Sequence, residues 1–150
     1  MSNQQVNAEG KRKVEAELLK RGAGSISYHR GRKSILKATS SDRSRTVDLR
    51  IKTKRKGNWH TTSDEAKQAG NSQNWAEETT FWVFVDMGGD ARYWIVPDLW
   101  LRNDIYEAHQ QYLSKHGGRR PKNDKSNHHS IEESRLEEWQ DKWEILGIFH

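Results

Sequence analysis

Residues 52–60 bring together the side-chain types that best suit binding to a polyanion. This segment, KTKRKGNWH, holds four cations, an indole ring and an imidazole: Lys52, Lys54, Arg55, Lys56, Trp59 and His60. Cations neutralise phosphate groups and an aromatic ring stacks on a base, and this combination recognises single-stranded or distorted nucleic acid. The pattern predicts that nucleic acid binds to Arg50, Lys54, Arg55, Lys56 and Trp59. Basic residues of the neighbouring hairpin are expected to contribute as well: Arg30, Arg32, Lys33 and Lys37. In the alternative interpretation, Trp59 belongs to the core and the charges form a solvated turn.

The charge is distributed very unevenly along the chain. Residues 1–60 contain 16 Lys and Arg against 5 Asp and Glu, whereas residues 61–150 contain 10 against 16. The overall net charge of +5 therefore hides a strongly basic first half and an acidic second half. A polyanion would dock on the basic half, so we expect nucleic acid, DNA in particular, to be the partner.

Several other chemistries are excluded or find little support. The chain has no cysteine, which excludes disulfides, thiolate metal sites and a cysteine nucleophile and suits a reducing compartment. Its seven histidines include His109 and His116 at helical spacing and His128 next to His129. Zinc needs three or four convergent ligands, so this pattern gives little support to a zinc site. The sequence shows no glycine-rich phosphate loop and no serine nucleophile elbow. With no long apolar run, we expect a cytoplasmic protein that does not span a membrane.

The periodicity of the apolar residues predicts an α/β fold, with one domain over residues 1–150. Strands are expected at 25–29, 34–39, 46–54, 81–87 and 92–97, and helices at 8–21, from Pro97 to Gly117, and at 130–146. Residues 55–80 are rich in Gly, Asn, Ser and charge, which is typical of a long surface loop. We therefore expect a central sheet of about five strands with helices packed against it.

The segment 46–54 would hold the site side chains in place. In TVDLRIKTK, the apolar residues Val47, Leu49 and Ile51 alternate with polar ones. Because successive side chains of a strand point to opposite faces, these three face a core while Arg50 and Lys52 face the other way. The strand therefore presents a row of charges on one face of the sheet.

The order of these elements resembles a known enzyme superfamily. A first helix with KRKVEAELLKRG, a strand with VDLRIKTKRKGNWHT, an apolar hairpin of FWVFVDM and RYWIVPDLW, and a closing WQDKWEILGI follow one another over most of the chain. In this order they are similar to small bacterial members of the PD-(D/E)xK nuclease superfamily. The resemblance implies a restriction-endonuclease-like fold, in which helices flank a mixed sheet.

The same resemblance implies a metal-dependent reaction on phosphodiester bonds. In that superfamily an acid on one strand and an acid-x-Lys on the next hold Mg²⁺ and activate a water molecule. Carboxylates suit this hard cation, and the lysine stabilises charge that develops on the phosphate. Lys52 matches the motif lysine, but Arg50 stands where the acid is expected, and residues 34–39 contain no carboxylate. The motif is therefore degenerate. Asp48 with Glu65 and Lys67 also fits a looser spacing of an acid followed by Glu-x-Lys, but the segment around Glu65 lacks a strand pattern.

Other carboxylates could rebuild a metal site if the protein is active. In that case we expect Lys52 and Asp48 to be catalytic, with Asp48, Asp86 and Glu17 as ligands of Mg²⁺. Asp48 lies four residues before Lys52, which is roughly 13 Å along a strand. At that distance it cannot directly take the place of the missing acid.

Three functions are compatible with the sequence. The first is a nucleic-acid-binding protein with a nuclease-like fold and a degenerate motif, acting in DNA handling or defence. The second is an active Mg²⁺-dependent endonuclease that hydrolyses DNA. The third is a protein-interaction adaptor whose basic half meets an acidic partner. Cleavage that depends on a divalent metal separates the first two, and indifference to DNA at low salt favours the third.

Overall fold

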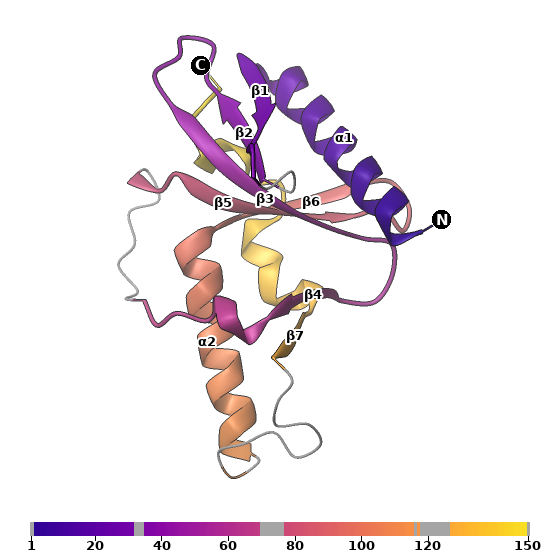
Figure 1. The fold of residues 1–150 in the computed structure, drawn as a ribbon, viewed down its shortest axis with the longest axis vertical. Coiled ribbons are helices and arrows are strands. Elements are labelled where there is room, and N and C mark those ends of the chain that lie inside the picture. The colour runs from indigo at the N-terminus through magenta and orange to yellow at the C-terminus, as the bar shows by residue number, and fades with distance from the viewer. Residues whose placement is uncertain (1, 32–34, 70–76, 116, 118–126, 150) are drawn as a thin grey trace.

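The computed structural model describes residues 2–31, 35–69, 77–115, 117 and 127–149 (Figure 1). Its centre is a five-stranded sheet in the order β1-β2-β3-β5-β6, in which β3 and β5 are parallel and the other neighbours antiparallel. These strands are β1 (Ser25–Tyr28), β2 (Ile35–Thr39), β3 (Thr46–Lys54), β5 (Thr80–Asp86) and β6 (Arg92–Pro97). A separate two-stranded sheet pairs β4 (Trp59–Thr62) with β7 (His128–Ile131). The predicted α/β class, with a mixed sheet of five strands flanked by helices, is confirmed.

Helices lie on both sides of the five-stranded sheet. The long helices are α1 (Asn3–Arg21), which packs against β3, and α2 (Asp98–Lys115), which lies on the opposite side (Figure 1). Among the described residues, short 3-10 helices also include η1 (Ser63–Glu65), η3 (Glu133–Trp139) and η4 (Trp143–Leu146). Within the described part of the chain, no helix combines the length and the apolar character needed to cross a membrane.

Helix α1 has clear start and stop signals and one unusually close contact with the sheet. Ser2 caps its first turn in a capping box with Gln5, and Gly22 ends it in the left-handed region, at a φ of 108°. Midway along the helix, a Cβ added at Gly10 would lie only 2.0 Å from Oγ1 of Thr53. The missing side chain of Gly10 therefore lets α1 lie directly on the end of β3.

The sheet separates two hydrophobic clusters. One lies on the α1 side and includes Val14, Leu18, Leu49, Phe81, Val83, Val85, Ile95 and Trp143. The other lies on the α2 side and includes Trp59, Trp82, Phe84, Trp94, Leu101, Ile105, Leu136 and Trp139. Since β5 contributes alternate residues to both clusters, this central strand is buried along nearly its whole length.

Two segments differ from the predicted elements. The predicted loop at 55–80 contains β4 and η1, because Trp59 and Thr61 alternate inward and the strand pairs with β7. The predicted helix at 130–146 is instead the end of β7 followed by η3 and η4. Its apolar stripe is buried as expected, but Asp141 adopts a positive φ of 56° between the two 3-10 helices. A continuous α-helix cannot pass through that conformation.

Candidate nucleic-acid interface

The charged face of β3 is divided between an internal polar network and an open groove. In the parallel pairing of β3 with β5, three charged residues of β3 lie opposite residues of β5: Arg50 opposite Trp82, Lys52 opposite Phe84, and Lys54 opposite Asp86. The described pairing with β2 stops at Ile35 opposite Arg50, so the last four residues of β3 extend beyond it. The surroundings of this face therefore change along the strand.

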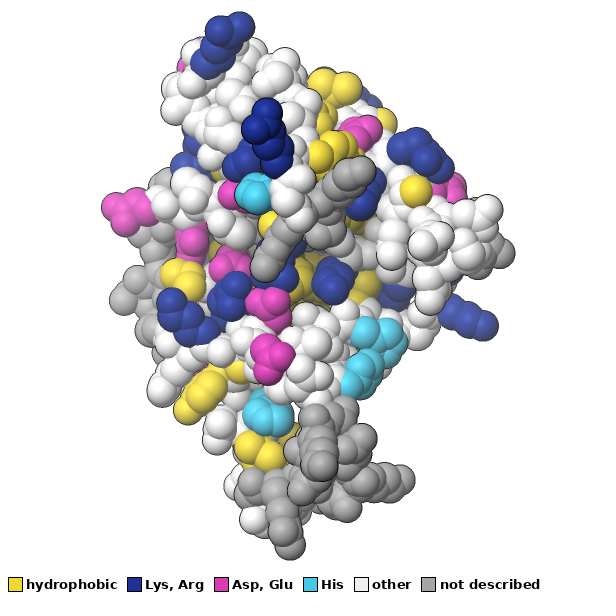
Figure 2. Space-filling model, in the orientation of Figure 1, with side chains coloured by type: hydrophobic (Ala, Val, Ile, Leu, Met, Phe, Trp, Pro, Cys, Tyr) yellow, Lys and Arg dark blue, Asp and Glu magenta, His cyan; other side chains and the backbone are white. Residues whose placement is uncertain are grey.

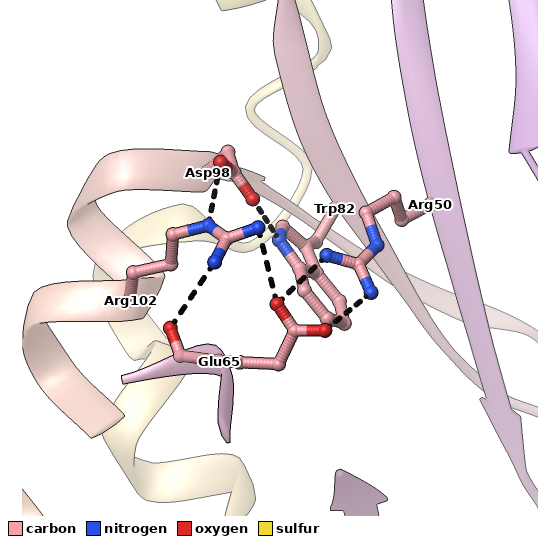
Figure 3. A network of polar contacts seen from close by, with 5 residues as sticks. All are labelled: Arg50, Glu65, Trp82, Asp98 and Arg102. Carbon is pink, nitrogen blue, oxygen red and sulfur yellow. Dashed lines mark hydrogen bonds and ion pairs between the residues drawn. The ribbon is translucent and has the colours of Figure 1, made fainter. Parts of the chain in front are cut away.

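Arg50 belongs to the internal network, which Figure 3 shows from close by. Its guanidinium lies 3.9 Å from the Trp82 ring centroid and donates two hydrogen bonds to the Glu65 carboxylate, at 3.0 and 2.7 Å. Arg102 forms a second ion pair with Glu65, at 3.1 Å, and another with Asp98, at 2.9 Å. Asp98 also accepts a 2.7 Å hydrogen bond from the Trp82 indole. The network thus ties β3 and β5 to η1 and α2.

The charges of this network are matched internally. The hydrogen bonds from Arg50 hold the pKa of Glu65 below its ordinary value, against the opposing effect of burial, and the charges of Arg50, Arg102 and Lys52 lower it further. The Arg50 and Glu65 side chains are both only about a fifth exposed. We expected Arg50 to bind nucleic acid, but its guanidinium is taken up by the ring and carboxylate beside it. The acid that pairs with Arg50 comes from η1, a segment predicted to be loop.

Lys52 is the next residue on the same face and has a different environment. It is half-buried, and among the described residues it makes no hydrogen bond or ion pair. Burial lowers the pKa of Lys52 and the charge of Arg50 lowers it further, while Glu65 acts in the opposite direction. A buried ammonium group without a bonded counter-charge is costly, and an incoming anion would relieve that cost.

Lys54 shapes the turn that follows the strand. Its ammonium group lies 4.4 Å from the Trp59 ring centroid, donates a hydrogen bond to the Gly57 carbonyl, and lies 3.9 Å from the Asp86 carboxylate. Trp59 itself is 2% exposed, and its indole donates a 3.0 Å hydrogen bond to the Val85 carbonyl. The prediction that Trp59 stacks on a base is therefore wrong. The alternative holds for this residue, because the ring is part of the core.

A groove of about 680 Å³ opens between the N-terminal part of α1 and the connection from β3 to β4. Its basic lining residues come from both elements: Lys11, Lys52, Lys54, Arg55, Lys56 and His60. Amide side chains add further donors at Asn3, Asn7 and Asn58. None of the described residues that line this groove is an Asp or Glu. We call it the basic groove. Such a lining fits phosphate groups, which accept hydrogen bonds and carry negative charge.

The remaining predicted binding residues fall into three groups. Arg55 and Lys56 line the basic groove, as expected. Lys37 instead forms a 2.8 Å ion pair with Asp48 on the neighbouring strand, and Arg30 is exposed beside β1. Arg32 and Lys33 lie outside the described residues. Figure 2 shows Lys and Arg side chains, with Asp and Glu side chains among them, across the middle of the molecule, between the region of α1 and β1–β3 and that of β4, β7 and α2.

The structure does not bring the predicted metal ligands together. Glu17 pairs with Arg21 on α1, and Asp48 pairs with Lys37. Asp86 pairs with Arg92 at the far end of β5, six register positions from Asp48. Within the described residues, no group of three or more His, Asp or Glu side chains could hold a metal ion. The expected ligand set is therefore wrong as a cluster, because strand register and α1 keep its members apart.

Several residues of this region have no signal in the sequence that would predict their place here. Lys11 was not predicted because only the packing of α1 on β3 brings it to the groove. On the adjoining small sheet, the His60 and His128 ring centroids lie 4.8 Å apart, and the Ser130 hydroxyl lies 3.4 Å from a nitrogen of each ring. These residues meet because β4 and β7 pair, and short strands far apart in the chain give no pairing signal.

Comparisons with known proteins add no relative to this picture. The sequence matches no protein-family model, no curated protein and no solved structure. The geometry of the described residues offers a basic groove beside a neutralised polar network.

Proposed function

We propose that this protein binds nucleic acid, DNA in the first place, through the basic groove. The observation that carries the proposal is the lining of the groove, which combines five Lys and Arg residues with no carboxylate among its described residues. A basic surface without acids favours the sugar-phosphate backbone over a protein surface of mixed charge. The proposal includes a nuclease-like fold with a degenerate motif and a role in DNA handling or defence.

Two observations favour binding over cleavage. Arg50 fills the position where the resemblance expects an acid, and its guanidinium already pairs with Glu65. Asp48, Asp86 and Glu17 are separated and each pairs with a basic side chain. In this proposal Lys52 contributes positive charge to the groove rather than assisting a bound metal.

The binding test compares two double variants of equal net charge. In Lys11→Glu/Lys56→Glu both changes lie in the basic groove, and in Lys20→Glu/Lys142→Glu both lie on exposed sites outside its lining. Fluorescence anisotropy with labelled DNA measures the affinity at several salt concentrations. For single strands each lost phosphate contact flattens the slope of log K against log[salt] by about 0.7. We expect the groove variant to flatten it by about 1.4 and the control variant to leave it nearly unchanged.

A cleavage assay on labelled plasmid separates the alternatives. The protein is incubated with Mg²⁺, Mn²⁺ or EDTA, and wild type is compared with Lys52→Ala. Salt-sensitive binding without nicking supports the proposal. Metal-dependent nicking that is lost in Lys52→Ala would instead establish an active endonuclease. Equal weakening in the two double variants would mean that net charge, not the groove, attracts DNA, and no binding at low salt would favour an adaptor with an acidic protein partner.

A further inference from the structure

A second concave surface lies beside the basic groove, around the end of β1. It has a volume of about 460 Å³ and is lined by Lys11, Tyr28, His29 and Arg30. Tyr28 is 36% exposed, and among the described Phe, Trp and Tyr residues it is the only one with that degree of exposure. It lies on β1, at the edge of the five-stranded sheet. Tyr28 is thus an exposed ring among cations, whereas the other described Phe, Trp and Tyr side chains are partly or fully buried.

Lys11 joins the two concave surfaces. It lines both the basic groove and the surface around Tyr28, and its ammonium group lies 6.0 Å from the Tyr28 ring centroid. A flexible strand could therefore lie in the groove with its phosphates and reach Tyr28 with a base. A rigid duplex keeps its bases stacked on one another and cannot offer them to a ring at the side.

We infer that Tyr28 is a stacking platform for one base of a single-stranded nucleic acid whose phosphates lie in the basic groove. This inference rests on the proposed function and names its substrate class, a flexible strand. Lys11 and Arg30 neutralise the phosphates that flank the stacked base. The stacking role that the sequence predicted for Trp59 is thus assigned to Tyr28.

The local contacts of Tyr28 suit this role. Its hydroxyl donates a hydrogen bond to the Glu15 carboxylate on α1, which fixes the orientation of the ring. Burial and the bond to Glu15 raise the pKa of the Tyr28 phenol, so the ring stays neutral and does not repel phosphate. Because the hydroxyl is held from the helix side, the exposed part of the ring is left for an apolar partner.

The experiment measures the preference for strands that carry bases. Anisotropy titrations compare an oligothymidylate with an abasic strand of the same length and charge, for wild type, Tyr28→Leu and Tyr28→Phe. Both variants lose the hydroxyl and its bond to Glu15, but only Tyr28→Phe keeps the ring. We expect wild type and Tyr28→Phe to bind the base-bearing strand about fivefold or more tightly, the lower end of the value of stacking on one base. In Tyr28→Leu the two strands should bind alike.

The outcomes separate this inference from the proposed function. If wild type binds both strands alike and remains sensitive to salt, the groove recognises phosphate only and the stacking role is overturned. If Tyr28→Leu keeps the full preference, another ring performs the stacking and the inference is also overturned. If no strand binds at low salt, the proposed function fails as well. Circular dichroism melts of the three proteins confirm that each variant is folded at the assay temperature.

Discussion

Removing the charge of Glu65 should destabilise the fold measurably. The substitution Glu65→Gln keeps the shape of the side chain but removes the negative charge that pairs with Arg50 and Arg102. One amide oxygen can still accept one hydrogen bond, whereas the carboxylate accepts two from Arg50. The substitution therefore tests how much the charge of Glu65, as opposed to its shape, contributes to holding η1 against the sheet.

The expected cost follows from the geometry. A hydrogen bond to a charged group contributes about 1.5 to 3 kcal/mol, and losing one partner of a fully buried pair costs about 3 to 5 kcal/mol. These side chains are about a fifth exposed, and Gln restores part of one bond. We therefore expect a loss of about 2 kcal/mol in the free energy of unfolding. For a chain of this size that corresponds to a decrease in Tm of about 4 to 8 °C.

The effect should depend on pH in a defined direction. Because the hydrogen bonds from Arg50 lower the pKa of Glu65 in the folded state, its charge stabilises the fold fully above the ordinary pKa of 4.5. The contribution is lost as the pH falls through the lowered folded-state value. The difference between wild type and Glu65→Gln should therefore be constant near neutral pH and shrink below about pH 4.5.

Urea denaturation at several pH values measures this difference. The matched control is Glu132→Gln, the same change at an exposed site that forms no ion pair with the described residues, which should cost less than about 0.5 kcal/mol. A cycle with Arg50→Met, which keeps an unbranched stem over Trp82, should give a coupling of more than about 1 kcal/mol. If Glu65→Gln costs no more than the control, or if the difference from wild type does not change with pH, the ion pairs of Glu65 do not stabilise the fold.

Two further substitutions test the packing around the groove. Gly10→Ala should destabilise the protein by about 1 to 3 kcal/mol although alanine favours helices, because the new methyl group would overlap Thr53. Denaturant titrations measure the free energy of unfolding. The control Arg12→Ala, at an exposed site on the same helix, should leave this free energy unchanged or raise it slightly. If Gly10→Ala also leaves it unchanged, the close contact with Thr53 is refuted. Trp59→Phe should cost about 1 to 3 kcal/mol because the buried hydrogen bond from the indole to the Val85 carbonyl is lost, while DNA affinity stays unchanged at a temperature where the variant is folded. If Trp59→Phe instead lowers DNA affinity while the protein remains folded, Trp59 is a stacking residue after all.

The sequence predicts the main sheet because its signals are local. The alternation in β3 and the apolar run in β5 each identify a strand without knowledge of the rest of the fold. The four-residue strands β4 and β7 are different, because they form only when segments some 70 residues apart meet, as His60 and Ser130 do. The same limit applies to the C-terminal stripe, whose apolar spacing fits an α-helix and two 3-10 helices equally well.

For the candidate site, the sequence predicts which residues carry charge but not what each charge meets. Lys52, Arg55 and Lys56 line the groove as their clustering suggests. Arg50 has the same chemistry two residues earlier, yet an acid from η1 neutralises it. Lys11 reaches the groove only because α1 lies close to β3. Such contacts depend on tertiary packing, which residue types and spacing do not encode by themselves.

The parallel pairing of β3 with β5 has a consequence for the order in which the chain folds. The antiparallel neighbours β2–β3 and β5–β6 are joined by short turns and can form within their own segments. To pair β3 with β5 in parallel, residues 55–79 must close a long loop. This closure costs conformational entropy before the contacts between the two strands stabilise the pair. We therefore expect the docking of these two units to be the slow step of folding. Substitutions between β3 and β5 should mainly change the folding rate, and those in the later-forming sheet of β4 and β7 the unfolding rate.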